Sequence, residues 1–320
     1  MAHHRGFAMT VVPPCGPVIF LMGPTASGKS ALGMTLAKKH ALEIVNADSV
    51  QVYRHFNVGA AKPTQEEQNQ VRHHLLDRVG LPEIYSADRY REEAWAVVND
   101  CHSRRVVPLF VGGSGLYFRA VEQGLACMPP VDRVIRDAIR REGQRLGWPV
   151  LHERLQGYDP DLAGRIPAND SQRISQGLSV AIATGIPLSL WQQRQPPPPP
   201  LTILKLACQW PRDLLYQRID SRFDHMLAQG LLDEVQNVWQ AGHDRDHPAM
   251  KAVGYRQLFA FFDGHCSLEQ AVEWAKRESR RYAKRQITWL KRESGLISIP
   301  WNVPSQAFAA VTEFLGQHPL

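Results

Sequence analysis

The chain has 320 residues, of which 44% are hydrophobic and 21% charged, and it carries a net charge of +6. This composition is ordinary for a globular protein, and the longest apolar runs, residues 18–22 and 106–111, are far shorter than the roughly 20 residues that span a membrane. The five cysteines form no CxxC pair, which is typical of free thiols in a reducing cytoplasm, so we expect a cytoplasmic protein without a cysteine metal or redox motif.

The first part of the chain alternates short apolar runs with helical patterns. Residues 1–17 lack the apolar core of a signal peptide and are expected to form a tail. Strands are predicted at Val18–Met22, Leu42–Ala47 and Val106–Val111, and a helix at Ala31–His40. Strands separated by helices predict an α/β fold with a parallel sheet flanked by helices, and ligands then lie at the carboxyl ends of the strands.

The turn after the first predicted strand reads GPTASGKS and matches the P-loop pattern GxxxxGK[ST] in full. It follows a strand and opens a helix, as the pattern requires, so a sheet like that of the P-loop NTPases is expected. Backbone N–H groups of such a loop bind phosphate oxygens, its lysine adds a cation, and its last hydroxyl is a ligand for Mg²⁺. We therefore predict a diphosphate site, with Ser30 on the metal, at Gly23, Pro24, Thr25, Ala26, Ser27, Gly28, Lys29 and Ser30. The pattern leaves open whether the ligand is ATP or another diphosphate.

Asp48 follows the second predicted strand. A carboxylate there faces the P-loop from the neighbouring strand, where it is suited to hold metal-bound water or to act as a general base. An Asp after a strand is more often the N-cap of a helix, however, and the residues alone leave both interpretations open.

Residues 126–200 have a different character, since their pattern is helical and rich in Arg, Gln and Asp. They close with Pro196–Pro200, a run that is compatible with neither a helix interior nor a central strand and is typical of a stiff connector. We expect a helical insertion domain over 126–200, inside a catalytic core formed by residues 18–125 and 201–320.

After the insertion, a strand is predicted at Leu201–Ala207 and helices over 212–241 and 267–293. Arg218 and Arg222 are four residues apart, so they share one face of the first of these helices. Most such arginines form surface ion pairs, and an arginine directed at a phosphate is the functional minority.

The last of these helices is strongly basic. Lys276–Arg292 contains eight Lys or Arg and one Glu, a net charge of +7, so the rest of the chain has a net charge of −1. At about 100° per residue, all eight basic residues fall on one half of the helix. A charged face is usually only solvated, but one sign dominates here so strongly that the pattern predicts binding to nucleic acid.

Seven segments, in this order, resemble the tRNA dimethylallyltransferases, also called tRNA isopentenyltransferases. They are GPTASGKS (23–30), ADSVQVYR (47–54), GAAKPT (59–64), VGGSGLYFRA (111–120), NDSQRIS (169–175), AVGYRQL (252–258) and AKRQITWLKR (283–292). Apart from the P-loop each segment is weak evidence by itself, but seven in one order are highly specific. The resemblance covers about residues 18–292.

The resemblance implies transfer of a dimethylallyl group from dimethylallyl diphosphate to N6 of adenosine 37 in the anticodon loop of tRNA, with release of diphosphate and with Mg²⁺ as cofactor. Asp48 then matches the general base, Thr25 a hydroxyl near the diphosphate, and Arg222 the cation that stabilises the leaving group. A monomer is expected. The positions that match tRNA-contact segments are Asp48, Ser49, Val50, Gln51, Ser114, Arg136, Gln172, Arg173, Ile174, Ser175, Gln176, Lys251, Gly254, Tyr255, Arg256, Lys284, Arg285, Gln286, Trp289 and Lys291.

The chain departs from the family pattern at three positions. Ser114 replaces the usual threonine and keeps its hydroxyl, whereas Gln176 and Ser179 replace an arginine and a glutamate in the insertion, which puts one tRNA contact in doubt.

Two other functions fit part of the sequence. A P-loop kinase of a small molecule accounts for the P-loop and Asp48, but not for the basic helix or the seven segments. A nucleotide-switched binding protein of the GTPase kind lacks its guanine-reading Asn-Lys-x-Asp motif here. Prenyl transfer without ATP would separate the transferase from the kinase.

Overall fold

The computed structural model describes residues 12–126, 129, 131–194 and 197–320. The chain divides into two compact units: a core unit within residues 1–122 and 199–320, and an insertion unit within Gln123–Pro198. The predicted limits of the insertion, 126 and 200, lie close to these. Of the predicted tail, residues 1–11 lie outside the described residues, while Gly16 and Pro17 already belong to the first strand.

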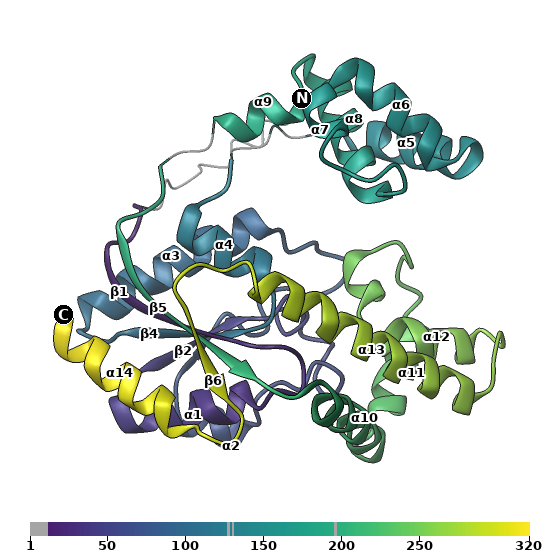
Figure 1. The fold of residues 1–320 in the computed structure, drawn as a ribbon. Helices are drawn as coiled ribbons and strands as arrows, with labels where there is room; N and C mark the ends of the chain where they lie inside the picture. The colour runs from purple at the N-terminus through teal and green to yellow at the C-terminus, as the bar shows by residue number, and fades with distance from the viewer. Residues whose placement is uncertain (1–11, 127–128, 130, 195–196) are drawn as a thin grey trace, which may run out of the picture. The chain divides into compact units, whose positions relative to one another are not determined.

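The core unit is built on a six-stranded sheet in the order β3-β2-β4-β1-β5-β6, in which every pair of neighbours is parallel (Figure 1). The α/β fold with a parallel sheet is therefore confirmed. Its two edge strands were not foreseen, because one has two residues and the other is half exposed. The strands are β1 Gly16–Met22, β2 Glu43–Ala47, β3 His73–His74, β4 Pro108–Gly112, β5 Leu201–Gln209 and β6 Leu296–Pro300.

Helices cover both faces of the sheet because its central strands are apolar on both sides. Along β1, Ile19 and Leu21 pack into the core cluster under α1 and α14, whereas Val18, Phe20 and Met22 belong to the larger cluster on the other face. The helices of the first half are α1 Lys29–His40, α2 Gln65–Gln70, α3 Ala87–Ser103 and α4 Gly115–Gln123, and the last helix is α14 Ser305–Gln317.

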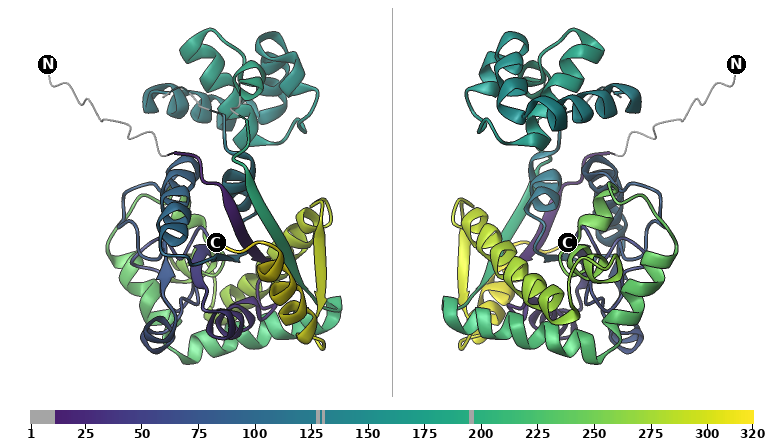
Figure 2. Two further views of the ribbon diagram at one scale, coloured as in Figure 1. Left: turned by 90° about the vertical axis from the view of Figure 1, so that its left-hand side faces the viewer. Right: turned by 90° about the vertical axis from the view of Figure 1, so that its right-hand side faces the viewer.

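Four further helices follow β5 and pack against one another beside the sheet (Figures 1 and 2). The stretch 212–241 is helical as predicted, but it forms two helices. The chain leaves the helix at Gln229 and turns through Gly230, whose φ of +94° is a left-handed conformation that glycine adopts without strain. A single glycine in a helical pattern gives little warning of such a break. The elements are α10 Arg212–Ala228, α11 Leu231–Gln240, η1 Pro248–Lys251, α12 Tyr255–Phe262 and α13 Leu268–Leu290.

The insertion unit is helical, with its own small core. Ile139, Leu151, Leu155, Ile174 and Leu178 are buried together in it. Its helices are α5 Arg133–Leu146, α6 Trp148–Tyr158, α7 Pro160–Ala163, α8 Ser171–Thr184 and α9 Leu188–Gln193.

Two expectations about the whole chain concern its thiols and membrane spans. In the described part of the chain, Cys15, Cys101, Cys208 and Cys266 are free thiols; Cys127 lies outside it. None of the helices described is long and apolar enough to cross a membrane.

Candidate active site

The P-loop joins β1 to α1 and has the left-handed turns of an anion-binding loop. Ala26 has a φ of +62° and Gly28 a φ of +82°, conformations that turn successive backbone N–H groups into one concavity. Gly23 is required by close approach, since a Cβ there would lie 2.6 Å from Ser27 Oγ. Lys29 Nζ donates a hydrogen bond to Pro24 O at 3.1 Å, so the lysine is already folded over the loop.

Two side chains that follow β5 hold this loop from outside. Trp210 Nε1 donates to Ser27 O at 2.8 Å, and Arg218 Nε donates to Ala26 O at 3.0 Å. The Arg218 guanidinium lies 4.3 Å from the centre of the Trp210 ring, so the two support each other. The left-handed Ala26, costly for a residue with a side chain, is stabilised by these contacts.

The predicted catalytic residues come together at the carboxyl ends of β1 and β2. These two strands were expected to be neighbours, but β4 lies between them. Arg222 Nη1 on α10 donates to Thr25 Oγ1 at 3.3 Å. Burial lowers the pKa of Arg222, and the Asp48 carboxylate opposes that effect. Burial also lowers the pKa of Lys29 to about 8; the Arg222 charge adds to that shift, whereas Asp48 opposes it. Two cations crowded in this way form a site that favours an anion.

Diphosphate binding is expected to weaken as the pH rises through the pKa of Lys29, about 8 in the free protein. A bound diphosphate favours the ammonium form, so the pKa of Lys29 is higher in the complex. Between the two pKa values binding takes up a proton, and the affinity should fall by up to about tenfold per pH unit. Calorimetry with inorganic diphosphate and Mg²⁺ from about pH 7 to about pH 9 measures this, with Lys29→Ala as the control. If the affinity of Lys29→Ala for diphosphate fell equally steeply with pH, the proton taken up on binding would belong to another group.

Asp48 does not cap a helix, so that interpretation of the sequence was wrong. The chain turns after β2, and Asp48 Oδ1 accepts the Val50 N–H at 2.8 Å, while the Asp48 N–H donates to Asn46 Oδ1 at 2.9 Å. Ser114, at the end of β4, accepts the Ser49 N–H at 3.0 Å through its hydroxyl. The hydroxyl that serine shares with the family's threonine thus fixes the turn that carries Asp48.

A cavity of about 370 Å³ opens beside these groups, with Thr25, Asp48 and Arg222 in its polar wall. The remaining walls are mostly apolar and aromatic, which is typical of a small-molecule site. Burial raises the pKa of the Tyr282 hydroxyl to about 12, so Tyr282 is neutral here. Side chains of the wall that sequence reasoning missed include Tyr53, Tyr85, Tyr117, Ile219, Phe223, Met226 and Tyr282. Three of them, Tyr53, Tyr117 and Tyr282, lie in or directly beside recognised segments, and this position was the available signal.

Most of the positions in the core unit that were assigned to tRNA contact are accessible. Val50, Lys251 and Arg285 line the cavity. Gln51 is partly buried, and its amide donates to Ala60 O at 3.0 Å. The remaining exposed side chains are those of Ser49, Arg256, Lys284 and Lys291.

Other positions in this set are corrected by the structure. Tyr255 is 0% exposed and donates its hydroxyl to Glu234, so it holds a wall of the cavity. Gly254 is buried at the start of the same helix. Trp289 packs on Phe118, with ring centres 6.1 Å apart, and Gln286 is 6% exposed and turned toward the P-loop. Gln286 and Trp289 face inward because this side of α13 lies directly against the loop after β4.

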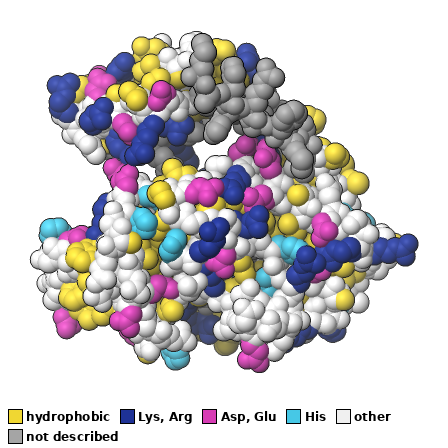
Figure 3. Space-filling model, turned by 180° about the vertical axis from the view of Figure 1, so that it is seen from behind, with side chains coloured by type: hydrophobic (Ala, Val, Ile, Leu, Met, Phe, Trp, Pro, Cys, Tyr) yellow, Lys and Arg dark blue, Asp and Glu magenta, His cyan; other side chains and the backbone are white. Residues whose placement is uncertain are grey.

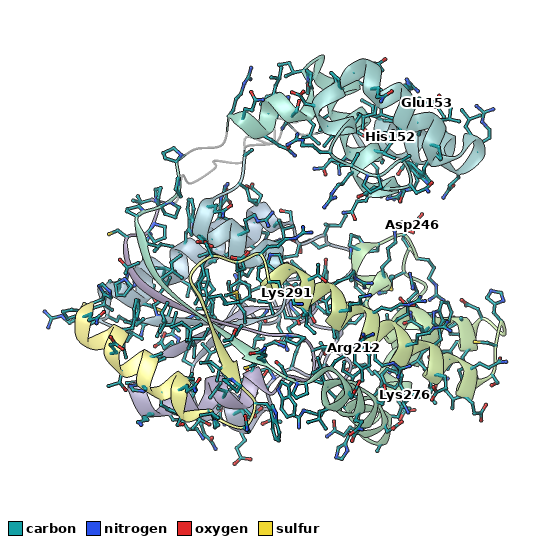
Figure 4. All side chains as sticks on the ribbon, viewed as in Figure 1. His152, Glu153, Arg212, Asp246, Lys276 and Lys291 are labelled. Carbon is teal, nitrogen blue, oxygen red and sulfur yellow. The ribbon has the colours of Figure 1, made fainter. Side chains whose placement is uncertain are left out.

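The basic face of α13 is smaller than the sequence predicted. Lys276 and Arg280 form ion pairs with Asp224 and Asp220 of α10, at 2.7 and 2.6 Å. Lys276 lies in the N-terminal half of α13 and Lys291 at its C-terminal end (Figure 4). The side of the molecule seen in Figure 3 carries Lys and Arg interspersed with Asp and Glu. The exposed basic face, as we use the term below, consists of Arg277, Arg281, Lys284, Arg285, Lys291 and Arg292.

Changing Arg281, Lys284 and Lys291 to Gln is expected to weaken tRNA binding and to flatten its dependence on salt. Each lost phosphate contact should lower the slope of log K against log [salt] by somewhat under one unit. Filter binding over a range of salt concentrations measures both quantities. The matched control removes the same charge elsewhere, at the exposed Lys38, Arg72 and Arg105. Equal slopes for the two triple variants would mean that the face of α13 is only solvated.

In the insertion unit, the predicted contact residues lie on α5 and α8. Gln172, Arg173 and Gln176 are exposed and Ser175 is partly buried, whereas Ile174 is 0% exposed and belongs to the core of the unit, so its assignment to tRNA was wrong. Arg136 is exposed on α5. At the departure Ser179, the side chain is 2% exposed and its hydroxyl has no hydrogen-bond partner among the described atoms, so it offers RNA no contact.

Comparison with known proteins agrees with this geometry. Residues 51–293 match the family described as IPP transferase. The chain belongs to this family. The tRNA dimethylallyltransferase of Magnetococcus marinus is 49% identical over 297 residues, which are 91% of this chain and 96% of that relative. The tRNA dimethylallyltransferase of Nitrosomonas europaea is 43% identical over 88% of this chain and 89% of its own.

Solved structures of the family share the fold. The full-length tRNA isopentenylpyrophosphate transferase of Bacillus halodurans superposes with a TM-score of 0.71 at 31% identity, over 94% of this chain and 97% of its own. A eukaryotic dimethylallyltransferase whose structures describe it acting on tRNA superposes with a TM-score of 0.81 at 25% identity, over 95% of this chain and 81% of its own. The sequence-based family assignment is therefore confirmed.

Proposed function

We propose that the protein transfers a dimethylallyl group from dimethylallyl diphosphate to N6 of adenosine 37 in the anticodon loop of tRNA and releases diphosphate. The observation that carries the proposal is that an anion site, an apolar cavity and a carboxylate lie together. Thr25 of the P-loop, Arg222 and Asp48 form the polar wall of a cavity whose other walls are mostly apolar, and the charge of Lys29 interacts with those of Arg222 and Asp48. An allylic diphosphate needs this combination of an anion site with an apolar chain site.

The diphosphate is the leaving group in this reaction. As the bond between its oxygen and the allylic carbon breaks, the electron pair moves onto the diphosphate. Lys29, Arg222 and the N–H groups at the start of α1 are placed to stabilise that charge. Aromatic rings such as Tyr117 keep water from the allylic carbon and stabilise its positive charge.

Asp48 is the general base. The N6 amine of adenine forms the new bond to the allylic carbon and loses a proton, which the Asp48 carboxylate accepts. Adenine reaches the cavity only when it is turned out of its stack, and a loop base pays less for this than a paired one. The exposed basic face of α13 binds the phosphates of the same RNA.

Mg²⁺ fits the oxygen donors at the loop. The hydroxyl of Ser30 lies in the first turn of α1, directly after the P-loop, and Mg²⁺ prefers such oxygen ligands together with water and phosphate oxygens. Bound there, the ion would neutralise diphosphate charge. We further propose that the protein works as a monomer in the cytoplasm, where tRNA and reduced thiols are found.

The test is mass spectrometry of nucleosides from tRNA incubated with the protein, Mg²⁺ and dimethylallyl diphosphate, without ATP. The expected result is adenosine heavier by one C₅H₈ unit, confined to the position beside the anticodon. No mass gain on adenosine, together with phosphoryl transfer from ATP to a small-molecule acceptor in a separate assay, would establish the kinase instead.

A further inference from the structure

Gln286 connects the basic helix to the P-loop. It lies on α13 and is 6% exposed. Its Oε1 accepts the N–H of Thr25 at 2.9 Å, and its Nε2 donates to Gly113 O, at the end of β4, at 3.0 Å. One partner is a donor and the other an acceptor, so a single orientation of the amide satisfies both.

The space around this amide is closed on the side of β4. A Cβ on Gly113 would lie 2.2 Å from Gln286 Nε2 and 3.1 Å from Gly23 O. A side chain at position 113 would displace the Gln286 amide, so glycine here allows α13, the P-loop and the end of β4 to meet at this point. On Gly115 a Cβ would lie 2.5 Å from Trp289, one turn further along α13, so the helix is seated against this loop at two successive turns.

The N–H of Thr25 is thus held by a side chain of the protein, and the hydroxyl of the same residue accepts from Arg222 at 3.3 Å. A shift of α13 would move Thr25, and with it the contact that orients Arg222. In the same helical turn, Lys284 is exposed on the side opposite Gln286, and Arg285 is exposed about 100° round the helix. One rigid turn therefore carries an RNA-facing surface and the amide that holds the diphosphate loop.

We propose that Gln286 is a positioning residue through which binding of tRNA to α13 strengthens the diphosphate site. This inference rests on the proposed function. RNA bound to the exposed basic face restrains α13, and α13 then holds Thr25 and Arg222 in their binding geometry. The coupling is reciprocal, so bound diphosphate must strengthen tRNA binding by the same factor. A direct contact with RNA, the role that the sequence resemblance implies, would affect tRNA affinity alone.

Two variants test the amide. Gln286→Met removes both hydrogen bonds at similar volume, whereas Gln286→Glu keeps an acceptor for the Thr25 N–H but faces Gly113 O with a second acceptor. The control is Gln68→Met on α2, which also loses a bond from a glutamine amide to a backbone carbonyl, Pro63 O at 3.0 Å, away from the site. Melting temperatures of all three show that each is folded.

The measurement is calorimetric affinity for inorganic diphosphate with Mg²⁺, with and without saturating unmodified tRNA, together with tRNA affinity by filter binding. In the wild type we expect tRNA to raise the diphosphate affinity by about fivefold or more, within the usual range of coupling. Gln286→Met should weaken diphosphate binding by about tenfold, and the factor by which tRNA raises the diphosphate affinity should fall close to one. Its affinity for tRNA in the absence of diphosphate should change by less than about twofold. Gln286→Glu should also lose the coupling, and Gln68→Met should keep it.

Weaker tRNA binding with normal diphosphate affinity in Gln286→Met would overturn the proposal in favour of a direct RNA contact. A coupling unchanged from the wild type in both Gln286 variants would overturn it as well. The proposed function is tested separately, by prenylation of tRNA with the wild-type protein, because the binding measurements need no turnover.

Discussion

Replacing Asp48 by Asn is expected to lower the single-turnover rate of prenyl transfer by about 10²–10⁴, the usual share of a general base. The N6 amine loses its proton as it attacks the allylic carbon, and an amide at position 48 accepts no proton. The turn after β2 should survive, because an Asn side-chain oxygen accepts the Val50 N–H as Asp48 Oδ1 does at 2.8 Å.

The rate is measured on preformed complexes, so that it reports chemistry and not binding. Affinities for tRNA and for dimethylallyl diphosphate should change much less than the rate, and Asp48→Ala, which also removes the turn contact, should lose stability in addition. Wild-type chemistry in Asp48→Asn would remove the base assignment and leave Asp48 as the residue that shapes this turn.

The second large effect is expected on the activity of Lys29→Ala. It should cost about 3 kcal/mol of transition-state stabilisation, or about two orders of magnitude in kcat/KM, as expected for a lost electrostatic contact to a developing charge. Lys29 Nζ is held over the loop by Pro24 O at 3.1 Å, so it meets the diphosphate already in place. Arg222 remains in this variant, and residual activity is therefore expected.

Steady-state kinetics with varied dimethylallyl diphosphate measure this loss, and filter binding should show almost unchanged affinity for tRNA. Lys38→Ala is the matched control, because Lys38 lies on the same helix but is exposed near its other end. Near-normal turnover in Lys29→Ala would show that the P-loop does not bind the substrate diphosphate.

The parts of the fold that were predicted correctly are those that depend on residues close together in the sequence. The apolar run at Val18–Met22 and the loop GPTASGKS sit where the pattern placed them, between a buried strand and a helix. Local rules also explain the errors. The break at Gly230 depends on one residue, and β6 at the sheet edge lacks the continuous apolar run of the inner strands.

The candidate site was predicted only in part, for a similar reason. A segment that matches the family pattern indicates which positions matter, but not the direction in which each side chain points. Arg222 was placed correctly beside the P-loop, yet Ile174 and Tyr255 came from equally good segments and are 0% exposed. A helix turns by about 100° per residue, so of two adjacent residues in one segment one can point to the surface and the other into the core.

The sequence by itself determined the α/β class, the P-loop and the strongly basic helix α13, because each follows from consecutive residues or from a short repeat in the sequence. Only the tertiary structure decided which side chains meet. Lys276 and Arg280 of α13 pair with α10, and Gln286 reaches Thr25, which is 261 positions away in the chain. Such contacts depend on how helices pack on the sheet, a property that the local pattern of charge and hydrophobicity does not contain.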